Sequence, residues 1–187
     1  MDKKRVYKRI FILVVLLIVG SVIFYFVHKV NAAYPQVKKV DVTFGQEAKL
    51  SDGLSMCVKN TKYIKPKEAE DLYGKEVMKR AATAHDNNYE IIQVSAVIKN
   101  TSEKEQDYDL YNINIANDAY SDGMPMELYD SDDAFALNLK KGESKEVVLS
   151  YIMESFKFTA KMWSHFDDVE FYLASSHYPV KTTWEIK

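Results

Sequence analysis

Hydrophobic residues alternate with polar ones through most of the chain after residue 40, a period of two that is typical of half-buried β-strands. Five stretches show it clearly, with inward positions at Val40, Val42 and Phe44; Leu54, Met56 and Val58; Ile92, Val94, Ala96 and Ile98; Phe135, Leu137 and Leu139; and Val147, Leu149, Tyr151 and Met153. Residues 169–175 and 182–186 add two strand-like runs. Seven or eight strands separated by turns predict a mainly β protein, an immunoglobulin-like antiparallel β-sandwich.

Residues 66–83 interrupt this alternation with a helical period. Pro66 suits the first position of a helix, and three acidic residues follow it where the helix dipole favours negative charge. Apolar residues then recur at spacings of three and four, at Ala69, Leu72, Tyr73, Val77, Met78 and Ala81. The pattern predicts one inserted helix of about four turns lying against a sheet, although Gly74 disfavours it by about 1 kcal/mol.

The stretch from Val97 to Ile115 passes from apolar alternation into the polar run NTSEKEQD and back again. Asn, Thr and Ser stabilise tight turns through side-chain hydrogen bonds to the backbone. Tyr111, Ile113 and Ile115 then resume the alternation. We therefore predict a corner between two antiparallel strands here, and no working site. The sequon beginning at Asn100 accepts a glycan only in hosts with that machinery.

An uncharged run of 18 residues, Ile10 to Val27, lies near the N-terminus. As a helix it covers about 27 Å, close to the bilayer core of about 30 Å. Five basic residues precede it and one Lys follows closely, so the positive-inside rule places the N-terminus in the cytoplasm. The sequence predicts a single-pass membrane protein with a cytoplasmic tail (1–9), a transmembrane helix (10–27), a linker (28–39) and an extracytoplasmic domain (40–187).

A cleaved signal peptide is the alternative interpretation of this run. Val30-Asn31-Ala32 offers small residues of the kind that signal peptidase accepts, and cleavage near Ala32 would give a secreted protein. Against this, the run exceeds the usual apolar length of about 7 to 15 residues, and the aromatic residues 24–26 suit an interfacial anchor. No cysteine stands directly after the run, which excludes a lipid-modified N-terminus.

Composition and charge agree with a folded, exported domain. Of the 187 residues, 47% are apolar and 28% are charged, as in globular proteins. Residues 1–9 hold five of the 25 basic residues and one of the 27 acidic ones, which leaves the rest with a formal charge of −6. Because nucleic-acid binding depends on Lys and Arg contacts to phosphate, we expect no nucleic-acid partner.

The chain shows no recognisable apparatus for catalysis or metal binding. No zinc-ligand spacing links the four histidines, His28, His85, His165 and His177. Two acidic clusters fail the EF-hand pattern and are interpreted as solvated loops; they are Asp107 with Asp109, and Asp130 with Asp132 and Asp133. Nucleophile elbows and phosphate-binding glycine loops are absent. We expect no enzyme activity, no metal and no cofactor.

Cys57 is the only cysteine, so no disulfide within the domain is expected. By strand parity its side chain lies opposite the face shared by Leu54, Met56 and Val58, either exposed or covered by the helix. A structural thiol is one interpretation, and intermolecular pairing or redox sensing is the other.

Residues 156–166, FKFTAKMWSHF, concentrate four aromatic residues and a methionine beside two lysines. We interpret the segment mainly as core that seals one end of the sandwich. The alternative is a surface for a partner, and Trp163 is then the candidate interaction hot spot.

Several phrases in order resemble the uncharacterised immunoglobulin-like surface proteins of Gram-positive bacteria, which are grouped as domains of unknown function. The phrases are Tyr34-Pro35, FGQEAKLSDGLSMCV, VIKNTSEKEQDYDL, LKKGESKEVVLSYIM and SSHYPVK. The resemblance covers most of residues 34–187 and implies a membrane-anchored extracytoplasmic sandwich without established activity. Many relatives look like lipoproteins, whereas this chain has a spanning helix, and the resemblance assigns no functional residues.

These observations favour a membrane-anchored extracytoplasmic module that works by binding. The 13 tyrosines support a protein partner, because Tyr is enriched at interfaces. The expected setting is an accessory role beside a transporter or cell-envelope system. The alternative is a receptor for a small solute or a cell-wall fragment, held in a cleft between the helix and the sheet. A hydrolase with an unrecognised site is a third hypothesis.

Overall fold

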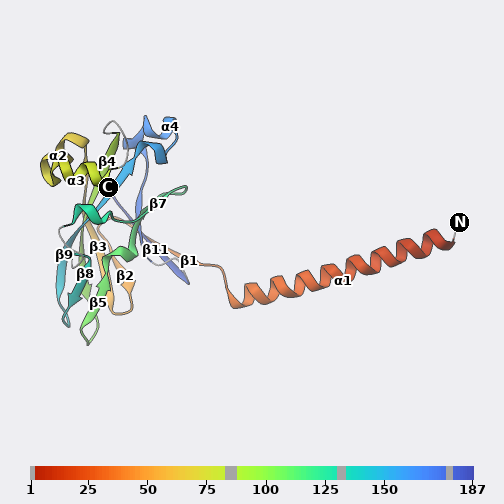
Figure 1. Ribbon diagram of the computed structural model, residues 1–187. Helices are drawn as coiled ribbons and strands as arrows, with labels where there is room; N and C mark the ends of the chain where they lie inside the picture. Colours follow the sequence, from red (N-terminus) through yellow and green to blue (C-terminus); the bar gives the residue numbers. More distant parts are fainter. Residues whose placement is uncertain (1–2, 83–87, 130–133, 176–178) are drawn as a thin grey trace. The chain divides into compact units, whose positions relative to one another are not determined.

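The structure, a computed structural model, describes residues 3–82, 88–129, 134–175 and 179–187. They divide after Val37 into a helical unit and a β-rich unit (Figure 1). The helical unit is α1, Lys3–Ala33. Residues Tyr7–Ala33 of this helix are long and apolar enough to cross a membrane. The helix continues beyond the apolar run on both sides, and the segment between it and the first strand is residues 34–37.

The β-rich unit contains two main sheets and a small one. Sheet A has the order β1 (Lys38–Val42), β11 (Val180–Glu185), β10 (Tyr172–Ser175), β6 (Ile113–Ala116) and β7 (Ser121–Asp122). Sheet B has the order β2 (Glu47–Ser51), β3 (Leu54–Ile64), β4 (Tyr89–Asn100) and β9 (Ser144–Glu154). The small sheet pairs β5 (Gln106–Asp109) with β8 (Ala136–Leu139).

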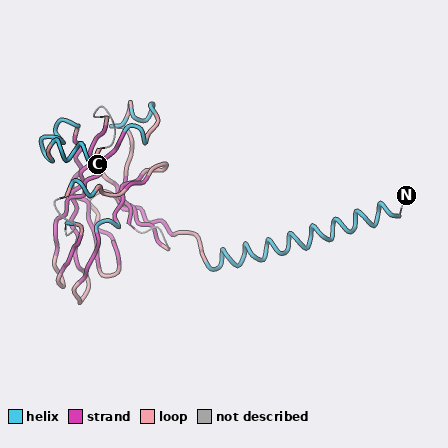
Figure 2. Tube along the Cα trace, viewed as in Figure 1, coloured by secondary structure: helices cyan, strands magenta, loops and turns pink. Residues whose placement is uncertain are grey.

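Short helical segments connect and cover these strands. The α-helices are α2 (Pro66–Tyr73), α3 (Lys75–Ala81) and α4 (Ala160–Trp163). The 3-10 turns include η2 (Leu110–Asn112), η3 (Met126–Leu128), η5 (Ser155–Lys157) and η6 (Phe166–Asp168). Figure 2 shows α2, α3 and α4 toward the same end of the long strands.

The core lies between sheets A and B, as the alternation predicts. Ile92 of β4 and Ile115 of β6 are fully buried in one apolar cluster that both sheets share. Two hydrogen bonds also cross between the sheets: the Tyr151 hydroxyl donates to the Ile113 carbonyl at 2.9 Å, and Trp184 Nε1 donates to the Met56 carbonyl at 3.2 Å. The predicted β-sandwich is therefore confirmed.

The outer face of sheet B is covered by the helical insertion. Ile64, Ile91 and Ile152 point away from the main core and are buried against Ala69 and Met78 of α2 and α3. Apolar residues on both faces of β4 are thus buried, as its sequence predicts.

The insertion is two helices, so the prediction of one continuous helix over residues 66–83 is wrong. Pro66 does occupy the first helical turn. Gly74 has φ 90° and ψ 140°, which is outside helical backbone geometry, and it ends α2 and precedes α3. Glycine adopts such a positive φ with little strain.

The strands and their pairing differ from the predicted antiparallel sandwich in three places. β2 is an additional strand that forms a hairpin with β3. β1 and β11 pair in parallel, which requires a long connection, and the rest of the domain supplies it. The predicted hairpin around residues 100–106 is wrong, because β5 pairs with β8 and β6 pairs with β10.

Candidate functional site

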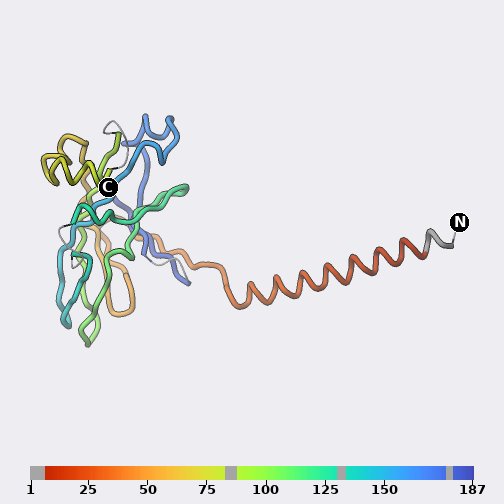
Figure 3. The backbone as a smooth tube through the Cα atoms, in the orientation of Figure 1, coloured from red at the N-terminus to blue at the C-terminus, as the bar shows by residue number. Residues whose placement is uncertain are grey.

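A groove of about 500 Å³ opens at the C-terminal ends of β1 and β11, beside η6 and residues 169–172. Five carboxylates and one lysine line it: Asp41, Asp167, Asp168, Glu170, Glu185 and Lys187. We call it the acidic groove. Two of the strands that contribute to it, β1 and β11, are far apart in the sequence and lie side by side in the fold (Figure 3).

Two carboxylates are fixed where β1 and β11 end. Thr183 donates its hydroxyl hydrogen bond to Asp41 at 2.5 Å, and this bond together with nearby Lys39 holds the pKa of Asp41 below its ordinary value. The backbone N–H of Phe44 donates to Glu185 at 3.0 Å, and this bond lowers the pKa of Glu185. Both groups therefore stay negatively charged to lower pH than free side chains.

The remaining carboxylates come from η6 and the residue run after it. Asp167 lies 3.2 Å from the ammonium group of Lys65, which also pairs with Glu90 at 2.6 Å. Its hydrogen bond to Glu90, and then that to Asp167, raise the pKa of Lys65. Within the described part of the chain, Asp168 and Glu170 are exposed and form no ion pair.

The floor of the groove is apolar and aromatic. Val42, Phe171 and Ile186 are buried at its base. Tyr63 is half-buried on one side, and burial, followed by the charges of Asp167 and Glu90, raises the pKa of its phenol. The groove therefore combines an apolar floor with a negatively charged rim.

The groove suits a ligand whose positive charges are spaced apart. In the regions that the structure describes, no three His, Cys, Asp or Glu side chains gather closely enough to hold a metal ion. A Lys or Arg side chain, by contrast, lays an aliphatic stem on apolar surface and presents its charge to a carboxylate.

Trp163, the predicted hot spot, ends α4 and packs against other aromatic residues. Its indole lies 5.9 Å from the ring centre of Phe158 and 4.8 Å from that of Phe166, and its Nε1 donates to Asn88 at 2.7 Å. Phe166 is buried and begins η6, so these contacts fix the segment that carries two groove carboxylates. This packing agrees with a seal at one end of the sandwich. Phe156 is the exception in the segment, because it is 64% exposed.

A second hollow of about 390 Å³ lies between β5 and β8 and is lined mainly by Tyr108, Tyr111, Phe135 and Leu137. Tyr111 and Phe135 stack with ring centres 3.9 Å apart. Burial, helped by Asp109, raises the pKa of Tyr108 to about 12, so its phenol stays neutral. This hollow is less charged than the acidic groove.

Residues 100–106, which we call the polar corner, are a structural connection between the sheets. Asn100 is 1% exposed and donates to the carbonyls of Lys104 at 2.7 Å and Leu139 at 2.9 Å. It accepts from the backbone N–H of Ser102 at 2.9 Å and from its hydroxyl at 2.8 Å. The whole capacity of the amide is used, so it fixes the turn as the polar composition predicts.

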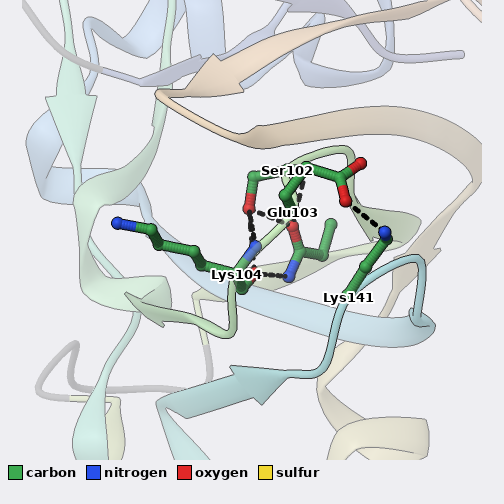
Figure 4. Close-up of polar contacts among 5 residues, drawn as sticks. Ser102, Glu103, Lys104 and Lys141 are labelled. Atoms are coloured by element: carbon green, nitrogen blue, oxygen red, sulfur yellow. Dashed lines mark hydrogen bonds and ion pairs between the residues drawn. The ribbon is translucent and has the colours of Figure 1, made fainter.

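The charged residues of the polar corner point outward. Glu103 pairs with Lys141, and Ser102 binds the backbone N–H of Lys104 (Figure 4). The Lys104 ammonium group points away from the Glu103–Lys141 pair (Figure 4). These are solvated charges on a turn.

The acidic residues and histidines weighed in the sequence analysis lie outside the acidic groove where the structure describes them. Asp107 accepts from Asn138 at 2.8 Å, and Asp109 accepts from the backbone N–H of Tyr111 at 2.9 Å at the start of η2. His28 lies in α1 and His165 precedes η6. The candidates His85, His177, Asp130, Asp132 and Asp133 lie outside the described residues.

Cys57 is buried, so the interpretation of an exposed thiol is wrong. Its sulfur lies 3.1 Å from the carbonyl oxygen of Gly45, in the turn before β2. The turn before β2 therefore contacts the thiol on the face whose covering strand parity left open.

None of the groove carboxylates was identified as a candidate from the sequence. Asp41 and Glu185 are separated by nearly the whole domain and meet only through the parallel pairing of their strands. The available signal was the acidic run Asp167-Asp168 with Glu170, directly after the aromatic segment.

The sequence model of a family described as domain of unknown function (DUF5028) matches residues 32–182. An uncharacterised β-sandwich protein from Clostridium difficile 630 is 19% identical, with a TM-score of 0.42 over 81% of this chain and 97% of that chain. The yjhA protein from Bacillus subtilis is 10% identical, with a TM-score of 0.47 over 78% and 99% of the two chains. A putative lipoprotein (ycdA) from Bacillus subtilis is 15% identical, with a TM-score of 0.46 over 75% and 38%. Curated proteins gave no match.

Proposed function

The chain belongs to the DUF5028 family, which is described as a domain of unknown function. We propose that it is a membrane-anchored binding module that acts without catalysis. In this proposal α1 spans the membrane once with its N-terminus in the cytoplasm. The sandwich is extracytoplasmic, and its acidic groove binds a positively charged segment of a protein partner. The setting is an accessory role beside a transporter or a cell-envelope system.

The observation that carries the proposal is the acidic groove itself. Five carboxylates and one lysine surround an apolar floor in a cavity of about 500 Å³. Three of the carboxylates pair with lysines of this chain, namely Asp41, Asp167 and Glu185. Exposed ion pairs contribute about 0 to 1 kcal/mol, so a partner's Lys or Arg can replace these lysines at little cost.

The rim of the groove already binds cations of this chain. The Lys181 ammonium group lies 5.1 Å from the ring centre of Tyr172 and 3.3 Å from its hydroxyl oxygen. Lys39 approaches the same ring at 6.0 Å. Aromatic faces attract ammonium and guanidinium groups, so Tyr172 offers a further contact for a basic segment.

The experiment is crosslinking in cells with the full-length chain, tagged at its C-terminus, followed by mass spectrometry. We compare the native chain with Asp168→Asn/Glu170→Gln, which removes two groove charges that form no ion pair within the described residues. The matched control is Glu105→Gln/Glu127→Gln, which removes two exposed charges that lie outside the groove. We expect the native chain and the control to capture at least one membrane or envelope protein in common. The groove variant should fail to capture that protein. Capture that is unchanged in the groove variant would exclude the groove as the binding site.

A small-solute receptor is the second candidate, because about 500 Å³ lies in the range of about 300 to 1,000 Å³ that is usual for small-molecule sites. A small polycation such as spermine and a Lys-rich peptide separate the two. We would titrate both into the full-length protein in detergent micelles. Tight spermine binding with no captured protein would favour the receptor. Binding of the peptide that weakens with salt supports the protein-binding module.

Trp163 stays a predicted hot spot, and its substitution separates two roles. Trp163→Phe retains most ring contacts with Phe158 and Phe166 and removes the indole donor. If Trp163 contacts the partner, capture falls while the stability of the sandwich changes little. If it only fixes η6, Trp163→Ala lowers both stability and capture, and Trp163→Phe preserves most of each.

A further inference from the structure

The first strand of the sandwich is held mainly by the last strand. β1 is exposed along most of its length, and only Val42 is buried. Five residue pairs join it in parallel to β11, from Lys38 opposite Val180 to Val42 opposite Trp184. The chain enters β1 directly from the membrane-helix unit through residues 34–37. Any tension on that connection therefore acts first on β1.

Additional hydrogen bonds fasten β1 at both ends. At its start, the Lys38 N–H donates to the carbonyl of Pro179 at 3.0 Å. At its end, Thr183 donates to Asp41 at 2.5 Å, and the Phe44 N–H just beyond the strand donates to Glu185 at 3.0 Å. The side chains of β11 thus reinforce the ladder at the end where the acidic groove lies.

β11, in contrast, is firmly fixed in the core. Trp184 is 1% exposed, and its indole donates across the sandwich to the Met56 carbonyl of β3 at 3.2 Å. Leu173 of β10 is opposite Trp184 in the antiparallel register and is fully buried. Force that reaches β11 is therefore shared with both sheets.

From this arrangement we propose that the β1–β11 pair is a mechanical clamp that keeps the sandwich folded under tension. When parallel strands are pulled from opposite ends, the force acts along the strands, and all rungs must fail together. When they are pulled from the same end, the rungs open one after another. Tension between the membrane helix and the groove loads the pair in the first way. The proposed function is needed only as the source of this tension.

Optical tweezers on the full-length protein in detergent micelles test the clamp. The shear arrangement carries handles at Gln36→Cys and Lys187→Cys, at opposite ends of the pair. The peel arrangement carries handles at Gln36→Cys and Pro179→Cys, at the same end. Native Cys57 is buried and is left in place. All rungs must break together in the shear arrangement and one after another in the peel arrangement. Unfolding under force is therefore slower in shear, and we expect the shear force to exceed the peel force by about twofold or more. Equal forces would overturn the proposal.

One substitution tests the fastening bonds. Thr183→Val keeps the shape of the side chain and removes its hydrogen bond to Asp41. Thr182→Val, the neighbouring residue on β11, is the matched control. We expect Thr183→Val to lower the ratio of shear to peel force and Thr182→Val to leave it unchanged. The ratio is the readout because a general loss of stability lowers both forces. An unchanged ratio in Thr183→Val would show that the hydrogen bond to Asp41 does not contribute to the clamp. Neither measurement requires a partner. The clamp proposal can therefore be overturned while the binding proposal stands, and the binding proposal can be overturned while the clamp proposal stands.

Discussion

The centre of sheet B and the β1–β11 end of sheet A are held together by different forces. β3, β4 and β9 are strands of 11 or 12 residues whose inward side chains are almost wholly buried. β1 has five residues, four of them not buried, and depends on polar bonds to β11. The first region supplies stability, and the second presents charge to solvent. Binding residues often lie on loops that a rigid scaffold positions, and the run from Asp167 to Glu170 is placed in this way beside the β1–β11 end.

The largest effect is expected at the centre of sheet B. Ile92→Ala removes a fully buried side chain between the sheets, and such truncations cost about 2 to 5 kcal/mol. Denaturant unfolding of the full-length protein in detergent, followed by the fluorescence of its two tryptophans, measures the change. Ile92→Val is the control, with an expected cost of about 0.5 to 1.5 kcal/mol. A loss in Ile92→Ala no larger than that of the control would show that the core does not carry the stability.

A smaller loss is expected where the β2–β3 turn contacts the polar corner. Gly53 has φ +84°, and an added Cβ would lie 2.9 Å from the Cβ of Ser102. We expect Gly53→Ala to cost about 1 to 3 kcal/mol, because both backbone strain and crowding oppose it.

Gly45 provides the control for this substitution. It has φ +78° and open space around the position of a Cβ, so Gly45→Ala adds backbone strain alone, with a cost of about 1 kcal/mol. The same unfolding assay measures both variants. Equal losses would show that the contact with Ser102 is unimportant.

Acid pH should weaken the β1–β11 end. Asp41 and Glu185 have pKa values below their ordinary 3.8 and 4.5 in the folded protein. Depressed carboxylate pKa values add stability above the unfolded pKa, and this stability is lost as pH falls through the folded pKa. We expect thermal stability to fall as the pH drops below about 4.5, and to fall less steeply in Glu185→Gln. Parallel pH curves for the two proteins would contradict this.

The smallest effect on stability is expected in the acidic groove. Asp168→Asn/Glu170→Gln removes charges that form no ion pair within the described residues, so unfolding should change by no more than about 0.5 kcal/mol. The same variant should lose its partner in crosslinking. A large stability loss would mean that Asp168 and Glu170 stabilise the fold.

The sequence predicted the first region far better than the second. Ile92, Val94, Ala96 and Ile98 follow the period of two that one buried face imposes, and Ile91 also indicates the covered outer face. Periodicity identifies such strands because burial acts on each side chain locally. The core and the sandwich were therefore accessible from the sequence.

Pairing was harder to predict, because it depends on partners far along the chain. The polar corner has the composition of a turn whether its flanking strands pair with each other or separate into different sheets. The acidic groove includes a hydrogen bond between Asp41 and Thr183, which are 142 positions apart. No local sequence pattern indicates a contact between residues so far apart.

The buried amide of Asn100 has a consequence for producing the protein. The sequon Asn100-Thr101-Ser102 is readable by eukaryotic secretory cells, which attach sugar before the chain has folded. In the folded sandwich this amide is 1% exposed and makes four hydrogen bonds, so there is no room for a sugar. A chain glycosylated at Asn100 would be unable to reach its native state. Expression in bacteria without this glycosylation machinery avoids the problem, and a glycan at Asn100 on protein from other hosts would identify misfolded molecules.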